Sequence, residues 1–360
     1  MNRAAIAFFV GTGAAVAIAV WVDSGAPTLP SDPVDAVPAR AAAMITIDLS
    51  EVRASPAFER ILGPPALRSE TCTRDPLEML DQLVLFASPG DHGALDHAGI
   101  LGLGATDRAA LAACARALLE DEGGTVVPTE IDGVPGFLLS APRPASESAS
   151  ESASESASES ALESSTELPA SRVVFLGAAV VAGSEATIHD VLAVARRTAP
   201  AFGADPVLRD LYRRMEGRGS IVAAARIPPT WRRSLHERLR ALGESPALSS
   251  AHAVGAALDL DAEPRLEARV LTETSDAAAA LSANLQALVE RASAIPLLRL
   301  SPLGPLLDRA RIEADRSELT IEMTLSEGQL EELVRLLAGQ IASETPPPSR
   351  VPTAPDLTFP

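Results

Sequence analysis

The sequence predicts an α+β fold of two similar halves, each an antiparallel sheet with amphipathic helices packed on one face, plus an N-terminal membrane helix. Residues 318–325 alternate apolar and polar side chains, which is the period of a strand with one buried and one wet face. Ser326 and Gln329 then form a capping box, after which the apolar residues take helical spacing as far as Ile341. A similar strand, cap and helix pattern recurs at residues 99–119, 180–194 and 266–289. One-sided strands of this kind suit an antiparallel sheet that carries helices.

Residues 1–22 predict a signal anchor or signal peptide. A single arginine precedes an apolar run at 4–22, which is about long enough to span a bilayer. No further arginine occurs before Arg40, so the positive-inside rule leaves the N-terminus in the cytoplasm and exports the rest. Residues 24–26 are small, as a signal peptidase requires at its cleavage site, but Pro27 just after them disfavours cleavage. We therefore expect an inner-membrane anchor with the folded part in the periplasm or another extracytoplasmic space, and a secreted protein if the leader is cleaved.

The rest of the chain divides by composition. The expected segments are a Pro-rich tether at 23–40, a first α+β domain at 41–199, a second at 205–342 and a disordered Pro-rich tail at 343–360. Inside the first domain, a Ser/Glu-rich stretch at 143–170 contains repeats of Ser-Glu-Ser-Ala and has almost no large apolar residue to bury. It predicts a disordered loop between neighbouring strands. A modification site for phosphate or sugar and a neutral insert are both compatible with it.

Composition excludes several classes of function. The net charge is -18, from 48 acidic and 30 basic residues, and an acidic balance argues against nucleic acid as a partner. Every basic residue is an arginine, so a phosphate-loop lysine, a Schiff-base lysine and a Ser-Lys dyad are all excluded. The chain also has no His-Glu-x-x-His and no Gly-x-Ser-x-Gly motif. We expect no cofactor.

The two cysteines, Cys72 and Cys114, predict a disulfide. An even pair in an exported protein is best interpreted as a bridge, and the loop it would close is long. Two buried free thiols are the alternative. A redox or metal role is less favoured because the chain has no Cys-x-x-Cys motif.

One group of residues suggests a metal site. Asp91, His92, Asp96 and His97 lie together in a loop between two expected strands, and carboxylates with imidazoles suit zinc or manganese. The spacing matches no standard site, and two nearby glycines favour a plain turn. A metal-dependent hydrolase that uses these four residues is the alternative function.

A basic region interrupts the acidic chain between residues 209 and 240. The candidate docking residues there are Arg209, Arg213, Arg214, Arg218, Arg232 and Arg233. They would suit an acidic envelope protein or anionic lipid headgroups. The simpler interpretation is two amphipathic helices whose polar faces are solvated.

The layout of the chain resembles a group of known proteins. Cys72 lies just before Asp75-Pro76-Leu77, a strand follows at 83–86, Cys114 lies on the next helix, and a strand–helix unit closes the fold. In these features the chain resembles uncharacterised secreted or membrane-anchored proteins of high-GC, myxobacteria-like bacteria. The resemblance implies export and a disulfide, and it implies no activity. The sequence thus predicts an exported, membrane-tethered, non-catalytic envelope protein that acts as a binding or scaffold module.

Overall fold

The computed structural model describes residues 27–55, 72, 76–89, 95–105, 107–121, 124–140, 171–233, 250–261, 263–295, 304–326 and 328–330. The strands are β1 (Ala43–Asp48), β2 (Gln82–Pro89), β3 (Leu95–Leu103), β4 (Thr125–Ile131), β5 (Val134–Ser140), β6 (Ser171–Leu176), β7 (Ala179–Gly183), β8 (Ile221–Arg226), β9 (Ala251–Asp259), β10 (Arg265–Thr272), β11 (Arg311–Asp315) and β12 (Glu318–Thr324). The helices are α2 (Pro33–Ala36), α3 (Leu49–Ala54), η1 (Pro76–Met79), α5 (Arg108–Asp121), α6 (Glu185–Ala195), η2 (Phe202–Ala204), α7 (Pro206–Met215), α9 (Ser275–Ser293) and α11 (Gly304–Arg309).

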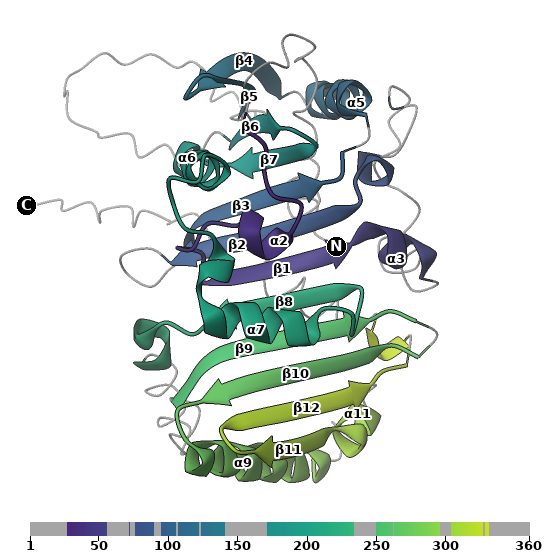
Figure 1. The fold of residues 1–360 in the computed structure, drawn as a ribbon. Coiled ribbons are helices and arrows are strands. Elements are labelled where there is room, and N and C mark those ends of the chain that lie inside the picture. The colour runs from purple at the N-terminus through teal and green to yellow at the C-terminus, as the bar shows by residue number, and fades with distance from the viewer. Residues whose placement is uncertain are drawn as a thin grey trace, which may run out of the picture.

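All twelve strands form one antiparallel sheet (Figure 1). Its order is β11-β12-β10-β9-β8-β1-β2-β3-β7-β6-β5-β4. Ile45 on β1 lies opposite Leu85 of β2 and, on the other side, opposite Ala223 of β8. The pairing of β1 with β8 therefore carries the sheet without a break across the boundary expected between residues 199 and 205. The prediction of a mixed helix and strand protein with antiparallel pairing is confirmed, but one sheet is present in place of two.

Helices cover both faces of this sheet, so the expectation that they pack on one face is wrong. On one face, which we call face A, α2, α6 and α7 enclose a core that includes Met44, Val84 and Leu101 (Figure 1). On the opposite face B, α5 and η1 pack over the β2, β3, β6 and β7 region. Farther along the sheet, α9 and α11 pack against β12. Residues 83–86 of β2 are all apolar, which is the pattern of a strand buried on both faces.

Glycines let two helices of face A approach the sheet closely. Gly99 lies beneath α6, where an added Cβ would be 2.2 Å from the Phe86 ring and 2.7 Å from Cγ2 of Thr187. Gly255 of β9 lies beneath α7, with Cγ of Leu211 only 2.8 Å from the position of a Cβ. Side chains of the helices thus occupy the space that larger strand residues would fill.

The proline-rich segment 23–40 is only partly as expected. From Pro33 it forms the short helix α2, with Asp32 as its cap, and Val34 and Val37 are fully buried. Asp followed by Pro is a helix-start signature, and it marks where the chain joins the core. The second part of the expected tether therefore belongs to the folded body.

Several predictions concern residues outside the described ranges. These are the leader at 1–22, the Ser/Glu-rich loop at 143–170, the tail at 343–360 and the closing helix beyond Leu330. Within the ranges that the structure describes, no helix is both long and apolar enough to cross a bilayer.

Candidate functional site

Helix α7 carries three of the six arginines of the expected docking surface, namely Arg209, Arg213 and Arg214. Asp205 caps it, accepting hydrogen bonds from the backbone N–H groups of Val207 and Leu208, and Pro206 occupies the first turn. This is the Asp-Pro start that the sequence indicates. The apolar side, which includes Leu208, Leu211 and Met215, is buried on face A of the sheet. The arginines project from the other sides of the helix.

Two of these arginines contact the segment that precedes β1. Arg209 donates a hydrogen bond to Asp35 at 2.7 Å. Arg213 forms an ion pair with Asp32 and donates a second hydrogen bond to Glu216 at 2.6 Å. The hydrogen bond to Glu216 is the main reason that the pKa of Arg213 is raised. These contacts fasten the start of the folded chain to α7.

Two further arginines of this region join an ionic network with the polar side of β10 and β12. Arg218 donates to Glu267 at 2.6 Å, and Arg269 donates to the same carboxylate through Nε at 2.9 Å. Arg269 also reaches Glu318 at 2.6 Å, and Arg214 donates to the second oxygen of Glu318 at 2.5 Å. Burial lowers the pKa of Arg269, but the two glutamates together raise it above its ordinary value. Glu267, only 6% exposed, is the most enclosed member of the network.

The expected docking arginines are therefore largely engaged by acids of the same chain. Arg232 donates to Glu273 at 2.7 Å, while Arg233 is exposed at the end of the described range. Five of the six candidates thus form ion pairs with described residues. Sequence reasoning missed Asp32, Asp35 and Glu318, which are far from the arginines along the chain. The sequence carries one signal of this ionic network, because Glu267 and Arg269 occur two residues apart on the polar side of an expected strand.

A shallow pocket lies beside the start of α7. Its volume is about 320 Å³, and its lining residues are Pro206, Val207, Asp210, His252, Leu271 and Ser317. Val207 is 40% exposed, so an apolar side chain borders solvent here. Nδ1 of His252 is buried, and no described residue forms a hydrogen bond with it. The pocket could accept a small apolar group. The carboxylate among its lining residues, Asp210, already forms an ion pair with Arg214 at 3.0 Å.

The buried side of α7 contains the only tyrosine of the chain. Tyr212 is 2% exposed and its hydroxyl donates to Oγ1 of Thr46 on β1 at 3.2 Å. Burial, which disfavours the phenolate, raises the pKa of Tyr212 from 10.0 to about 12. The hydrogen bond to Thr46 opposes this shift, and the nearby charge of Glu216 adds to it.

We expect this buried phenol to make the fold sensitive to alkali. Because the folded pKa of Tyr212 lies above the unfolded value, its contribution is complete below pH 10.0 and is lost as the pH rises towards about 12. The free energy of unfolding should fall by about 1.4 kcal/mol per pH unit in this interval from this group. Urea unfolding at stepped pH measures the slope, and the near-ultraviolet absorbance of tyrosinate reports Tyr212 alone. In Tyr212→Phe this part of the slope should vanish, at a cost of about 1 kcal/mol near neutrality. An unchanged slope in that variant would contradict the assignment.

The structure places the residues of the expected metal site only in part. Asp96 and His97 lie in β3, where His97 is opposite Ser88 of β2, whereas Asp91 and His92 lie outside the described residues. Among the side chains that are described, no group of three or more His, Cys, Asp or Glu could hold a metal ion. The metal site remains a prediction.

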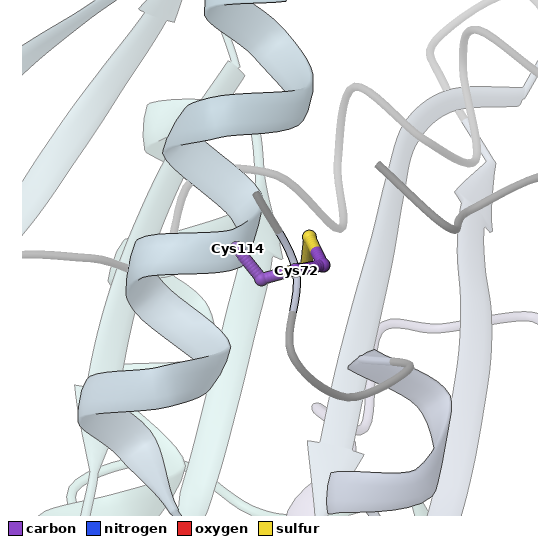
Figure 2. Close-up of a disulfide and its surroundings, with 2 residues drawn as sticks. All are labelled: Cys72 and Cys114. Atoms are coloured by element: carbon purple, nitrogen blue, oxygen red, sulfur yellow. A yellow bond between two sulfur atoms is a disulfide. The ribbon is translucent and has the colours of Figure 1, made fainter. Parts of the chain in front are cut away.

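The predicted disulfide is confirmed. Cys72 and Cys114 are bonded, and their Cα atoms are 4.8 Å apart (Figure 2). Cys114 lies on α5 and is 3% exposed, in the face B core with Leu111 and Phe137. The bridge thus fastens Cys72 to the helix layer of face B.

Comparison with known proteins adds little. No protein-family model matches the chain, and no curated protein matches it. A solved structure described as "Structure of crystal form I of TP0453" is similar over 88% of this chain and 99% of that chain, with 12% identity and a TM-score of 0.42. A likeness at this level carries no argument about function.

Proposed function

We propose that this chain is an exported, membrane-tethered protein of the cell envelope that acts as a non-catalytic binding or scaffold module. The Cys72–Cys114 bridge is the observation that supports this proposal most directly. Structural disulfides persist in oxidising compartments and are rare in the cytosol. Export through the leader at 1–22 would deliver the chain to such a compartment.

The attachment of α2 to α7 fits a tethered protein. Leu29 already packs against the face A core, and Asp32 and Asp35 are held by arginines of α7. Six residues (23–28) separate the leader from Leu29, and a fully extended chain of that length spans about 20 Å. An anchor at 1–22 would therefore keep the folded body close to the membrane surface, where an envelope protein or anionic lipid is the expected partner.

We further propose that the chain contains two related halves. In the first, β1, β2 and β3 are neighbours, and the hairpin β6–β7 joins β3 through β7. In the second, β8, β9 and β10 are neighbours, and the hairpin β11–β12 joins β10 through β12. A helix follows the third strand in both cases, namely α5 and α9. The hairpin β4–β5 is an addition of the first half. The shared strand order supports a scaffold built by repetition of one unit.

Cell fractionation tests the location. We expect the full chain in the inner-membrane fraction, digestible by a protease added from the extracytoplasmic side, with both cysteines blocked to alkylation until reductant is added. A variant without residues 1–22 should stay in the cytosol. Cytosolic full-length protein with two free thiols would overturn the proposal.

Elemental analysis tests the non-catalytic part separately. If the purified protein contained stoichiometric zinc or manganese that was lost in His92→Ala, this result would overturn the proposed binding module in favour of the metal-dependent hydrolase. Crosslinking in native cells, followed by mass spectrometry, would then identify the partner of a metal-free protein.

A further inference from the structure

The pocket beside the start of α7 has the size of a small-molecule site. Its volume is about 320 Å³, within the range of about 300–1,000 Å³ that is usual for ligand sites in proteins. Four elements meet there, namely the first turn of α7, the start of β9, the end of β10 and the turn between β11 and β12. Because these elements are far apart in the chain, the pocket exists only in the assembled fold.

A β-bulge brings the imidazole of His252 to this pocket. Ala253 of β9 lies opposite Leu271 of β10, and both contact the face A core. The next pair along is Ala251 with Thr272, so His252 between them is one extra residue. In a regular strand, successive side chains alternate between the two faces, which would turn His252 to face B. The bulge breaks this alternation, and His252 and Leu271 line the same pocket.

This imidazole has an unmet hydrogen-bonding atom. Nδ1 of His252 is buried, and no residue of the described chain forms a hydrogen bond with it. Buried polar atoms are nearly always paired, because an unpaired one keeps its desolvation cost. A ligand in the pocket would supply the missing partner. A hydroxyl group fits either tautomer of the ring, since it can donate to a bare nitrogen or accept from an N–H.

The two carboxylates at the start of α7 are already paired. Asp205 accepts hydrogen bonds from the first N–H groups of the helix, so these groups are not free for an anion. Asp205 also forms an ion pair with Arg226, and Asp210 forms one with Arg214. Neither carboxylate therefore lacks a counter-charge that a cationic ligand would provide. The side chain of Val207, which is 40% exposed, adds an apolar wall. The ligand that fits these surroundings is neutral.

We propose that this pocket binds a small neutral molecule that has a hydroxyl group on an apolar body. The hydroxyl bonds to Nδ1 of His252, and the body packs against Val207 and Leu271. The inference deepens the proposed binding module by naming its ligand class. It rests on that binding role and not on export or the leader, so a titration of the pocket and the cell fractionation can fail independently of each other.

Two probes that differ by one group test the site on the full, disulfide-bonded chain. Titration followed by fluorine NMR should show saturable binding of para-fluorophenol, with a dissociation constant on the order of 1 mM. The analogue para-fluorotoluene, which lacks the hydroxyl, should bind about fivefold more weakly because the bond to Nδ1 is lost. In His252→Phe the two probes should bind equally, whereas His189→Phe, a change on α6, should keep the preference. Wild-type protein that binds neither probe or binds both equally, or a preference that persists in His252→Phe, would overturn the proposal.

A second variant tests the apolar wall without a change to the histidine. Val207→Asp should weaken the binding of both probes about fivefold or more, because an apolar surface of the pocket becomes charged. Aspartate is favourable in the first turn of a helix, so we expect the fold to be retained. The matched control is Val127→Asp, since this valine is also exposed but lies on β4, remote from β9 and β10 in the sheet order. The control should bind both probes like the wild type, and equal effects of the two substitutions would contradict the site.

Discussion

Removal of the Cys72–Cys114 bridge, as Cys72→Ser with Cys114→Ala, is expected to lower the free energy of unfolding by roughly 4 kcal/mol. The bridged residues are 42 positions apart, and the bond restricts the unfolded chain over this long loop. Cys114 is also part of the face B core, so its replacement removes some packing. Urea unfolding followed by tryptophan fluorescence measures the loss.

Reductant supplies the control for this prediction. Wild-type protein unfolded with reductant should lose most of the same stability, because its reduced chain is equally unrestricted. The double variant should not respond to reductant at all. A variant as stable as the oxidised wild type would show that the bridge does not restrain the fold.

Replacement of Glu267 by glutamine is expected to cost about 3 kcal/mol. Glu267 is the enclosed carboxylate between Arg218 and Arg269, and its removal leaves Arg269 partly buried with Glu318 as its remaining acidic partner. A cation in a partly enclosed position keeps its desolvation cost when a partner is lost. The measurement is again the free energy of unfolding, at low and at high salt. The loss should persist at high salt because enclosed charges are weakly screened.

Glu322→Gln is the matched control. Glu322 lies opposite Glu267 on β12 but is exposed, so its replacement should change the free energy of unfolding by less than about 0.5 kcal/mol. Equal effects of the two substitutions would mean that burial of Glu267 is not what gives the network its strength.

Local structure could be predicted well from the sequence. The strand over Glu318–Thr324 follows from strict alternation, and α6 and α7 begin after Ser184 and Asp205, the residues that cap them. Caps and periods are determined by residues close together in the chain, so no tertiary knowledge is needed.

The two-sided helix cover could also have been predicted. Residues 83–86 are Leu-Val-Leu-Phe and 173–176 are Val-Val-Phe-Leu, which leave no polar face on either strand. The expectation of a one-sided cover rests on the alternating strands of the second half, such as Arg265–Thr272, which do carry a polar face. Continuous apolar runs of this length are typical of strands buried on both sides.

The pairing of the arginines could not be predicted in the same way. Arg213 meets Asp32 and Arg214 meets Glu318 because β1, β8, β10 and β12 lie near one another in the sheet order. That order is a property of the assembled sheet. From the sequence alone, arginines that face solvent cannot be distinguished from arginines that face carboxylates remote in the chain, because the two clusters have the same composition.

The position of β1 has a consequence for how the molecule is made. This strand lies at the centre of the sheet and is the first to leave the ribosome. Its second edge is paired only when β8, which contains Ala225 opposite Ala43, is available. Pairing between such remote parts of the chain slows folding, and an unpaired edge is prone to aggregate in the meantime. The first half therefore presents one unpaired edge of β1 until β8 has been synthesised.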